Sequence, residues 1–259
     1  MLLTAGCSFV WGDELDGFDQ NPPTHNNLTM THLLATSMKM DYINMGICGS
    51  CNDRIFRHVT DYLADPKKEN PSHMVIIWSA WQRQELVEHM SPYREANVCA
   101  SRPENATQYS PVRLNVIGDR EVRASLQKYY KDLYDCRTDI MHGITMIKTM
   151  ELLCQSLGIK LIQGVFHYRC WSNIMSVLNE EGAYDDGKQH QDLGSTPDYR
   201  KWLKDSLGAL SPNSRLGLGR GPSMYEVAKS HHDVKEFGHP GEITQIAYSQ
   251  MLKKMFDDM

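Results

Sequence analysis

Short apolar runs alternate along the chain with longer segments whose apolar residues recur at helical spacing. Residues 74–78 form the strongest run, and an unbroken apolar run is typical of a strand in a parallel sheet that is covered on both faces. Residues 1–3, 42–45 and 160–166 predict three further strands. Helical spacing predicts helices over the following segments: residues 28–40, the segment around Ile55, Val59 and Leu63, and residues 121–157, 171–179 and 242–259.

The alternation of strands and helices, without an internal repeat, predicts one α/β domain with a parallel sheet over residues 1–259. Two long insertions interrupt it. Residues 84–120 show a poor pattern in which we expect only local helix, and residues 181–222 are polar. The last predicted helix carries one apolar face, which is formed by Ile243, Ile246, Ala247, Met251 and Met255.

Composition and charge narrow the class of protein. Hydrophobic residues make up 41% of the chain and charged residues 23%, which is ordinary for a soluble globular protein. The net charge of −5 argues against a general nucleic-acid binder, which needs a basic surface. The seven cysteines are an odd number, and the chain begins directly with a strand, so we expect free thiols and a cytoplasmic protein. No apolar run approaches the ~20 residues needed to cross a bilayer, so we expect no membrane partner.

The candidate chemistry begins where the first strand ends. Gly6, Cys7 and Ser8 form a turn of small residues directly after an apolar run. Ligands of open α/β sheets bind at the carboxyl ends of the strands, so Ser8 stands where a nucleophile is expected. Right-handed crossovers place the other strand-end loops at the same edge, and these loops contain Gly49, Ser79 and His167.

Residues 6–12, Gly-Cys-Ser-Phe-Val-Trp-Gly, resemble the first signature block of the SGNH (GDSL-type) hydrolases, Gly-Asp-Ser-x-x-x-Gly. Cys7 replaces the usual aspartate, a position that is not the nucleophile in this family. The resemblance implies a three-layer α/β/α fold with a central parallel sheet, a serine nucleophile at Ser8 and no cofactor. Cys7 is the alternative nucleophile, but the Gly-x-Ser spacing favours Ser8.

A serine hydroxyl needs a base to take its proton, and histidine is the usual one. Residues 233–242 resemble the last block of the family, in which an Asp-x-x-His precedes a helix. His239 matches the histidine. Glu236 stands where the family has aspartate, and Asp233, three residues earlier, is a second candidate for the carboxylate that orients the imidazole. Taken alone, His239 would be read as a loop residue before a helix.

The resemblance also implies donors for an oxyanion. The backbone amide of Ser8 is one, and Gly49 in the second block is another, with Gly46 as the alternative. The third block departs from the family, because no asparagine follows the strand at residues 74–78. Ser79, Gln82 or Arg83 would have to donate instead.

Several residues are candidate substrate contacts, each with a plainer structural interpretation beside it. Trp11 and Trp81 line a pocket or pack in the core, and His167 contacts substrate or caps the sheet. Ser79 and Arg83 complete the set of candidate contacts. Cys48 and Cys51 form a Cys-x-x-Cys, which is compatible with a redox pair but also with plain small residues. The His231-His232 pair fits no zinc spacing, so no metal is expected.

The sequence thus predicts an SGNH-like serine esterase that acts on a small acyl ester of a small molecule or a carbohydrate, with an O-acetyl group as the family-level expectation. Its departures from the family pattern resemble divergent members from phages and bacteria. Two alternatives stay open: a non-catalytic protein of the same fold that binds a ligand or partner, and an acyltransferase. The oligomeric state is not readable from the sequence.

Overall fold

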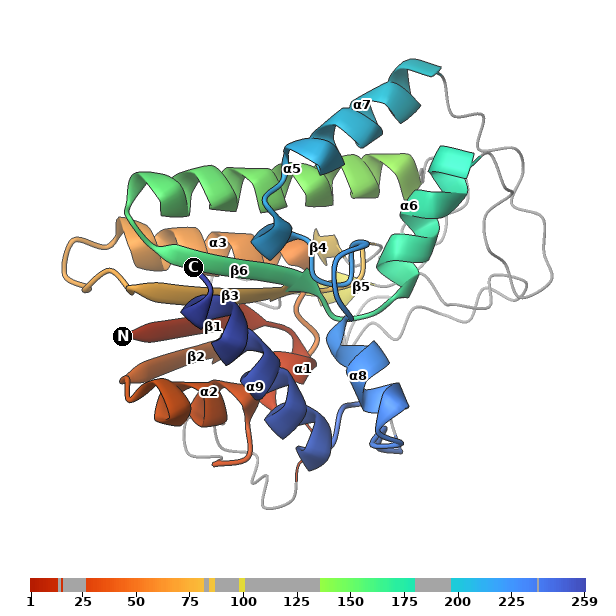
Figure 1. Cartoon of the computed structure of the whole chain (residues 1–259). Coiled ribbons are helices and arrows are strands. Elements are labelled where there is room, and N and C mark those ends of the chain that lie inside the picture. The colour runs from red at the N-terminus through yellow and green to blue at the C-terminus, as the bar shows by residue number, and fades with distance from the viewer. Residues whose placement is uncertain are drawn as a thin grey trace.

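The computed structural model describes residues 1–13, 15, 27–81, 84–86, 98–100, 136–179, 197–236 and 238–259. Its centre is a parallel sheet of β1 (Leu2–Gly6), β2 (Tyr42–Gly46), β3 (His73–Trp78) and β6 (Lys160–Val165). The strand order is β2-β1-β3-β6 (Figure 1). Leu2 of β1 pairs with Tyr42 on one side and His73 on the other. The parallel sheet predicted from the apolar runs is confirmed.

Helices cover both faces of this sheet, which confirms the three-layer α/β/α arrangement (Figure 1). One face, called here the α5 face, carries α3 (Asn52–Ala64), α5 (Cys136–Ser156), α6 (Arg169–Asn179) and α7 (Pro197–Ala209). The other, the α9 face, carries α1 (Ser8–Trp11), α2 (Met30–Met38), α8 (Met224–Ser230) and α9 (Glu242–Asp257). A short 3₁₀ helix, η2 (Pro212–Ser214), lies beside β6.

The apolar runs form strands because both of their faces are buried. Side chains alternate across a strand, so Val75 and Ile77 of β3 pack on the α9 face while Met74 and Ile76 pack on the α5 face. All four are fully buried. Mostly apolar strands are therefore favoured, and the polar residues that they contain, Thr4 in β1 and Gln163 in β6, are buried.

The strand order reverses at the centre of the sheet, and sheets of this kind have a ligand-binding crevice at the carboxyl edge beside that point. After β1 the chain forms β2 on one side of β1, and then crosses to form β3 on the other side. In such sheets the connections leave in opposite directions from the point where the order reverses, and ligands bind there. Here that point lies between the ends of β1 and β3, directly before Ser8 and Ser79.

Two helices differ from what the sequence pattern suggests. Within the insertion predicted at residues 181–222, Pro197–Ala209 forms the helix α7, which was not expected, and Leu203 and Leu207 bury its inner side in the α5 face. The final helix exists, but its buried face differs from the predicted one. Ile243 and Ile246 are exposed, whereas Tyr248 and other residues one position along the helix face the sheet.

The inner side of α9 carries several polar residues, so the apolar pattern of the sequence does not mark the side of the helix that is buried. Its buried residues are Thr244, Gln245, Tyr248, Ser249, Leu252 and Phe256. The predicted insertion at residues 84–120 falls mostly outside the described residues. Within it, β4 (Gln84–Leu86) and β5 (Val98–Ala100) pair as an antiparallel ribbon. The first part of the helix predicted over residues 121–157 also lies outside them.

Candidate active site

Ser8 is held directly beyond the end of β1. Cys7 is the N-cap of α1 and Ser8 its first residue, so the Ser8 N–H has no acceptor within the helix. Gly6 makes this tight turn possible: a Cβ on Gly6 would stand 2.8 Å from the carbonyl oxygen of Ile77 in β3. Any larger residue would push α1 away from the sheet, and Ser8 would move with it.

His239 lies in a hairpin-like loop that precedes α9. Val234 and Pro240 form an antiparallel bridge, and the Lys235 N–H donates to the His239 carbonyl oxygen over 2.8 Å. Gly238 takes a φ of 89°, which only glycine adopts readily. This backbone arrangement fixes the direction in which His239 leaves the loop.

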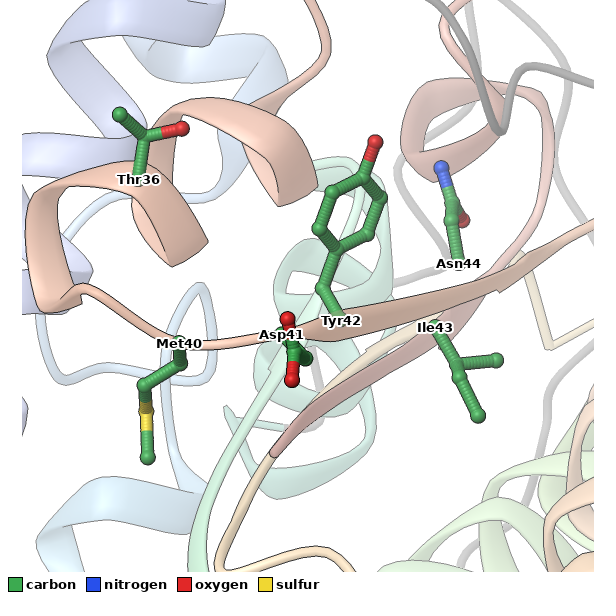
Figure 2. A pocket seen from close by; sticks show the side chains of 6 residues that line it. All are labelled: Thr36, Met40, Asp41, Tyr42, Ile43 and Asn44. Atoms are coloured by element: carbon green, nitrogen blue, oxygen red, sulfur yellow. The ribbon is translucent and has the colours of Figure 1, made fainter.

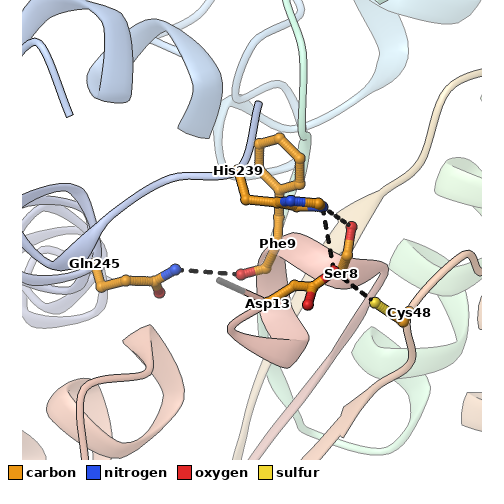
Figure 3. Close-up of polar contacts among 6 residues, drawn as sticks. All are labelled: Ser8, Phe9, Asp13, Cys48, His239 and Gln245. Atoms are coloured by element: carbon orange, nitrogen blue, oxygen red, sulfur yellow. Dashed lines mark hydrogen bonds and ion pairs between the residues drawn. The ribbon is translucent and has the colours of Figure 1, made fainter. Parts of the chain in front are cut away.

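The two residues meet across the crevice. His239 Nε2 lies 2.9 Å from Ser8 Oγ, within hydrogen-bond distance, although 231 positions separate them in the sequence (Figure 3). The His239 side chain is 17% exposed and Ser8 is 5% exposed, so the pair is largely shielded from water. A serine and a histidine in this geometry are the nucleophile and base that hydroxyl activation requires.

A buried glutamine ties α9 to the two helices nearest the site. The Gln245 side chain accepts from the Met30 N–H over 2.8 Å. It also donates to the Phe9 carbonyl oxygen over 3.4 Å, as Figure 3 shows. Gln245 is fully buried. Because Phe9 follows Ser8 and Gln245 lies one turn into the helix that follows His239, this contact fixes the two candidate residues relative to each other.

Asp13 is the residue at this site that the sequence analysis missed. Its Oδ2 lies 3.6 Å from His239 Nε2, and it accepts from the Cys48 thiol over 2.9 Å (Figure 3). Asp13 stands just after the turn that ends α1, on the same nitrogen side of the imidazole as Ser8. Its place directly after the first signature block was the one available signal.

The two acidic residues predicted to orient His239 lie elsewhere. Asp233 caps α9: its Oδ2 accepts from the N–H of Thr244 over 2.7 Å and from the hydroxyl of the same residue over 2.9 Å. Glu236 is exposed, and among the described residues no hydrogen bond or ion pair joins it to His239. Its role in orienting the imidazole stays a prediction.

The two candidate glycines for the oxyanion differ in what surrounds them. Gly46 is buried, its N–H donates to the Asn44 side chain over 2.9 Å, and a Cβ there would stand 2.5 Å from the Trp11 nitrogen. Gly46 is therefore needed for close packing, and its N–H is already used. Gly49 takes a φ of 75° in an exposed turn, and a Cβ there would meet nothing within 4 Å. Gly49 is therefore not needed for close packing, and its role in an oxyanion site stays a prediction.

The third block has a structural role where the structure describes it. The Ser79 N–H donates to Asn52 Oδ1 over 2.7 Å, and Asn52 Nδ2 donates to the Ser79 carbonyl oxygen over 3.3 Å. This reciprocal pair joins the start of α3 to the end of β3. Ser79 is fully buried. Its predicted contact with substrate stays a prediction. Gln82 and Arg83 lie outside the described residues.

Aromatic residues extend from the site along the carboxyl edge. The Phe9 ring lies 5.6 Å from the His239 ring and 4.7 Å from Phe166. The His167 ring lies 5.5 Å from Phe166 and, tilted, 4.2 Å from Tyr225. A series of ring contacts through Phe9 and Phe166 thus connects His239 with the predicted substrate contact His167.

The two predicted tryptophan positions differ in burial. Trp11 is the last residue of α1 and is half-buried. Trp81 is 3% exposed, and its indole N–H donates to the Cys170 carbonyl oxygen over 3.1 Å, so Trp81 is a core residue. Only Trp11 has the exposure that a substrate contact requires.

A cavity of about 420 Å³ lies between α2 and β2 (Figure 2). Its lining includes Thr36, Asp41, Tyr42 and Asn44. Ser8, Asp13 and His239 are not among the residues that line it. This cavity beside β2 is therefore not part of the candidate site at the serine–histidine pair.

The cysteines of the Cys-x-x-Cys occupy different environments. Cys48 is exposed, and its thiol donates a hydrogen bond to Asp13, whereas Cys51 is fully buried at the start of α3. Neither cysteine is in a disulfide. Cys7 is buried, and Ser8 rather than Cys7 meets His239. Burial raises the pKa of Cys154 to about 12, which keeps that thiol protonated.

No helix in the described part of the chain has the length and apolar character that a membrane span needs.

Comparisons with known proteins give a structural likeness only. No family model matches the chain, and no curated protein matches it in sequence. A candidate lipolytic protein of the G-D-S-L family from Desulfitobacterium hafniense DCB-2 is similar over 98% of this chain and 97% of its own, with 9% identity and a TM-score of 0.43. An acetyl xylan esterase, Est2A, from the rumen bacterium Butyrivibrio proteoclasticus is similar over 99% of this chain, with 11% identity and a TM-score of 0.40. The chain spans 63% of the length of that esterase. Both TM-scores are below 0.5, and neither likeness identifies a residue of the candidate site.

Proposed function

We propose that this chain is a serine esterase of the SGNH type that cleaves small acyl esters. The observation that carries the proposal is the 2.9 Å approach of His239 Nε2 to Ser8 Oγ at the crevice between β1 and β3. A sheet whose strand order reverses binds ligands at this point, and the pair supplies what acyl transfer from an ester requires there. An O-acetyl group on a carbohydrate remains the narrower form of the proposal.

In the proposed reaction, Ser8 Oγ attacks the ester carbonyl while His239 Nε2 takes the hydroxyl proton. The Ser8 and Gly49 backbone amides stabilise the oxyanion of the tetrahedral intermediate. His239 then returns the proton to the departing alcohol as the bond from carbonyl carbon to alkoxy oxygen breaks. The oxygen of a water molecule then attacks the acyl carbonyl while His239 takes one of its protons. The bond from the acyl carbon to Ser8 Oγ breaks, His239 returns the proton to Oγ, and the acyl group leaves as a carboxylic acid.

Steady-state hydrolysis of p-nitrophenyl acetate by the purified protein tests this function. Ser8→Ala and His239→Ala should each lower kcat/KM by at least ~10³-fold, because the nucleophile and its base act as one unit. Thr36→Ala is the matched control, since this side chain lies at the cavity beside β2 and should leave the rate unchanged. Turnover that survives in Ser8→Ala contradicts the proposal.

One observation favours a non-catalytic binding protein as the second candidate. Glu236, the acid expected to orient His239, is exposed and has no bond to it among the described residues. A binding protein of this fold would keep the crevice without turnover of any ester. A screen of short-chain esters separates the two candidates, and added alcohol or sugar acceptors would reveal acyl transfer through a faster release of p-nitrophenol.

A further inference from the structure

The charge of Asp13 stands beside the path of the leaving group. To return its proton, His239 Nε2 must come within ~3 Å of the leaving-group oxygen. Asp13 Oδ2 lies 3.6 Å from the same nitrogen. Whatever direction the substrate takes, its leaving oxygen therefore lies no more than about 6.6 Å from Oδ2, since the two separations set an upper limit. A cation carried by the leaving alcohol stands a few bonds beyond that oxygen, so its separation from Oδ2 is comparable to the ~8 Å over which salt screens charges at physiological ionic strength.

The carboxylate has no cationic partner in the described residues other than His239 itself. Its two contacts are the imidazole and the Cys48 thiol, and a thiol is a weak donor that carries no charge while it remains protonated. Lys235 and Glu236 belong to the His239 loop, but among the described residues neither is joined to Asp13 by a hydrogen bond or an ion pair. The negative charge is thus left to act on whatever enters the crevice.

The surroundings hold this charge in place. The Asp13 side chain is 28% exposed, and the Cys48 thiol donates to the same oxygen that approaches His239. A partly buried charge is screened less than an exposed one, so its effect on a nearby ligand charge persists at physiological salt.

We propose that Asp13 determines substrate specificity by charge: the site favours esters with a cationic leaving group and disfavours those with an anionic one. This inference rests on the proposed function, since it concerns the group that departs from the Ser8 adduct. It predicts a preferred chemistry for the alcohol half of the substrate, such as an amino alcohol or a quaternary ammonium alcohol, and leaves the acyl half open.

Two matched probes test the proposal. Both are diethyl phosphorothioates, one with thiocholine as the leaving group and the other with the neutral, equally shaped 3,3-dimethylbutanethiol. Ser8 Oγ forms the new bond to phosphorus, the phosphorus–sulfur bond breaks, and the thiol leaves with the serine proton. Intact-mass measurement over time gives the rate constant of modification for each probe.

The wild-type protein should react with the cationic probe at least ~3-fold faster than with the neutral probe, because opposite charges attract at this separation even at high dielectric. Asp13→Asn should bring the ratio of the two rates close to one. Asp13→Glu, which keeps the charge, should restore most of the preference. Asp41→Asn is the matched control: it removes an exposed aspartate at the cavity beside β2 and should leave the ratio unchanged.

The outcomes distinguish a failure of the charge proposal from a failure of the proposed function. Equal rates in the wild type, or a preference that persists in Asp13→Asn, overturns the charge proposal while the serine remains reactive. If folded wild-type protein reacts with neither probe, the serine is not activated, and the proposed function fails together with this inference.

Discussion

Gln163 lies on the α5 face of the sheet and Gln245 on the α9 face, and both are fully buried. Gln163 accepts from the Trp78 indole N–H over 3.1 Å and donates to the Ile147 carbonyl oxygen over 3.0 Å and to Ser214 over 3.1 Å. Its partners all belong to β3, α5 and η2. It therefore joins parts of the core that carry no candidate functional residue.

Gln245 makes fewer hydrogen bonds, but they join different parts of the chain. Met30 and Phe9 belong to α2 and α1, while Gln245 belongs to α9. The contact brings the end of the chain that holds His239 against the beginning that holds Ser8. A buried polar residue on one face thus stabilises the core, and a similar residue on the other sets the geometry of the site.

The largest effect on stability is expected for Gln163→Ala. It leaves the buried Trp78 N–H without its acceptor and opens a cavity, so the free energy of unfolding should fall by about 2–4 kcal/mol. The folded variant should retain kcat/KM for ester hydrolysis within about twofold, because Ser8 and His239 are not among its contacts. Chemical denaturation and steady-state kinetics check both values. A large loss of turnover in the folded variant would contradict the division between the two faces.

Gln245→Ala should lower the free energy of unfolding less, by about 1–3 kcal/mol, because it leaves the buried Met30 N–H unpaired. It should lower kcat/KM by about 10- to 100-fold, since small displacements of a catalytic group are costly. Gln250→Ala, an exposed glutamine on the same helix, is the matched control and should change neither quantity. Unchanged turnover in Gln245→Ala would remove the positioning role argued for this residue.

The smallest effect concerns the two acids before His239. Asp233→Asn weakens the cap of α9 and should lower the free energy of unfolding by about 1 kcal/mol, with a loss of turnover below tenfold. The exposed Glu236→Gln should change stability by less than ~0.5 kcal/mol and leave the rate nearly unchanged. Thermal denaturation and ester kinetics on both variants decide the matter. A thousandfold loss in either one would assign that acid the orienting role.

The sequence predicts the sheet well, because its strands are short and mostly apolar, and β3 is an unbroken apolar run buried on both faces. All four strands were located from mostly apolar runs, and the helices at residues 28–40 and 242–259 from their spacing. The buried face of α9 was not predicted, since Thr244 and Gln245 are buried and form hydrogen bonds with residues of other segments. Helix α7 was missed because its sequence is mostly polar, with few apolar residues for the core.

The candidate site could also be predicted from the sequence only in part. Ser8 and His239 were identified as a candidate pair from two short blocks at opposite ends of the chain, and the structure brings them together. Asp13 was missed because no local pattern reports that a turn after α1 brings its carboxylate to His239 Nε2. The use of Asp233 as a helix cap depends likewise on how the loop folds back on α9.

Labelling with a fluorophosphonate probe, followed by mapping of the adduct, tests whether His239 activates Ser8. Folded wild-type protein should form one adduct, on the peptide that contains Ser8, and His239→Ala should slow its formation by at least ~10²-fold. An adduct on another residue, or labelling of the wild type no faster than of His239→Ala, would contradict the claim that His239 activates Ser8.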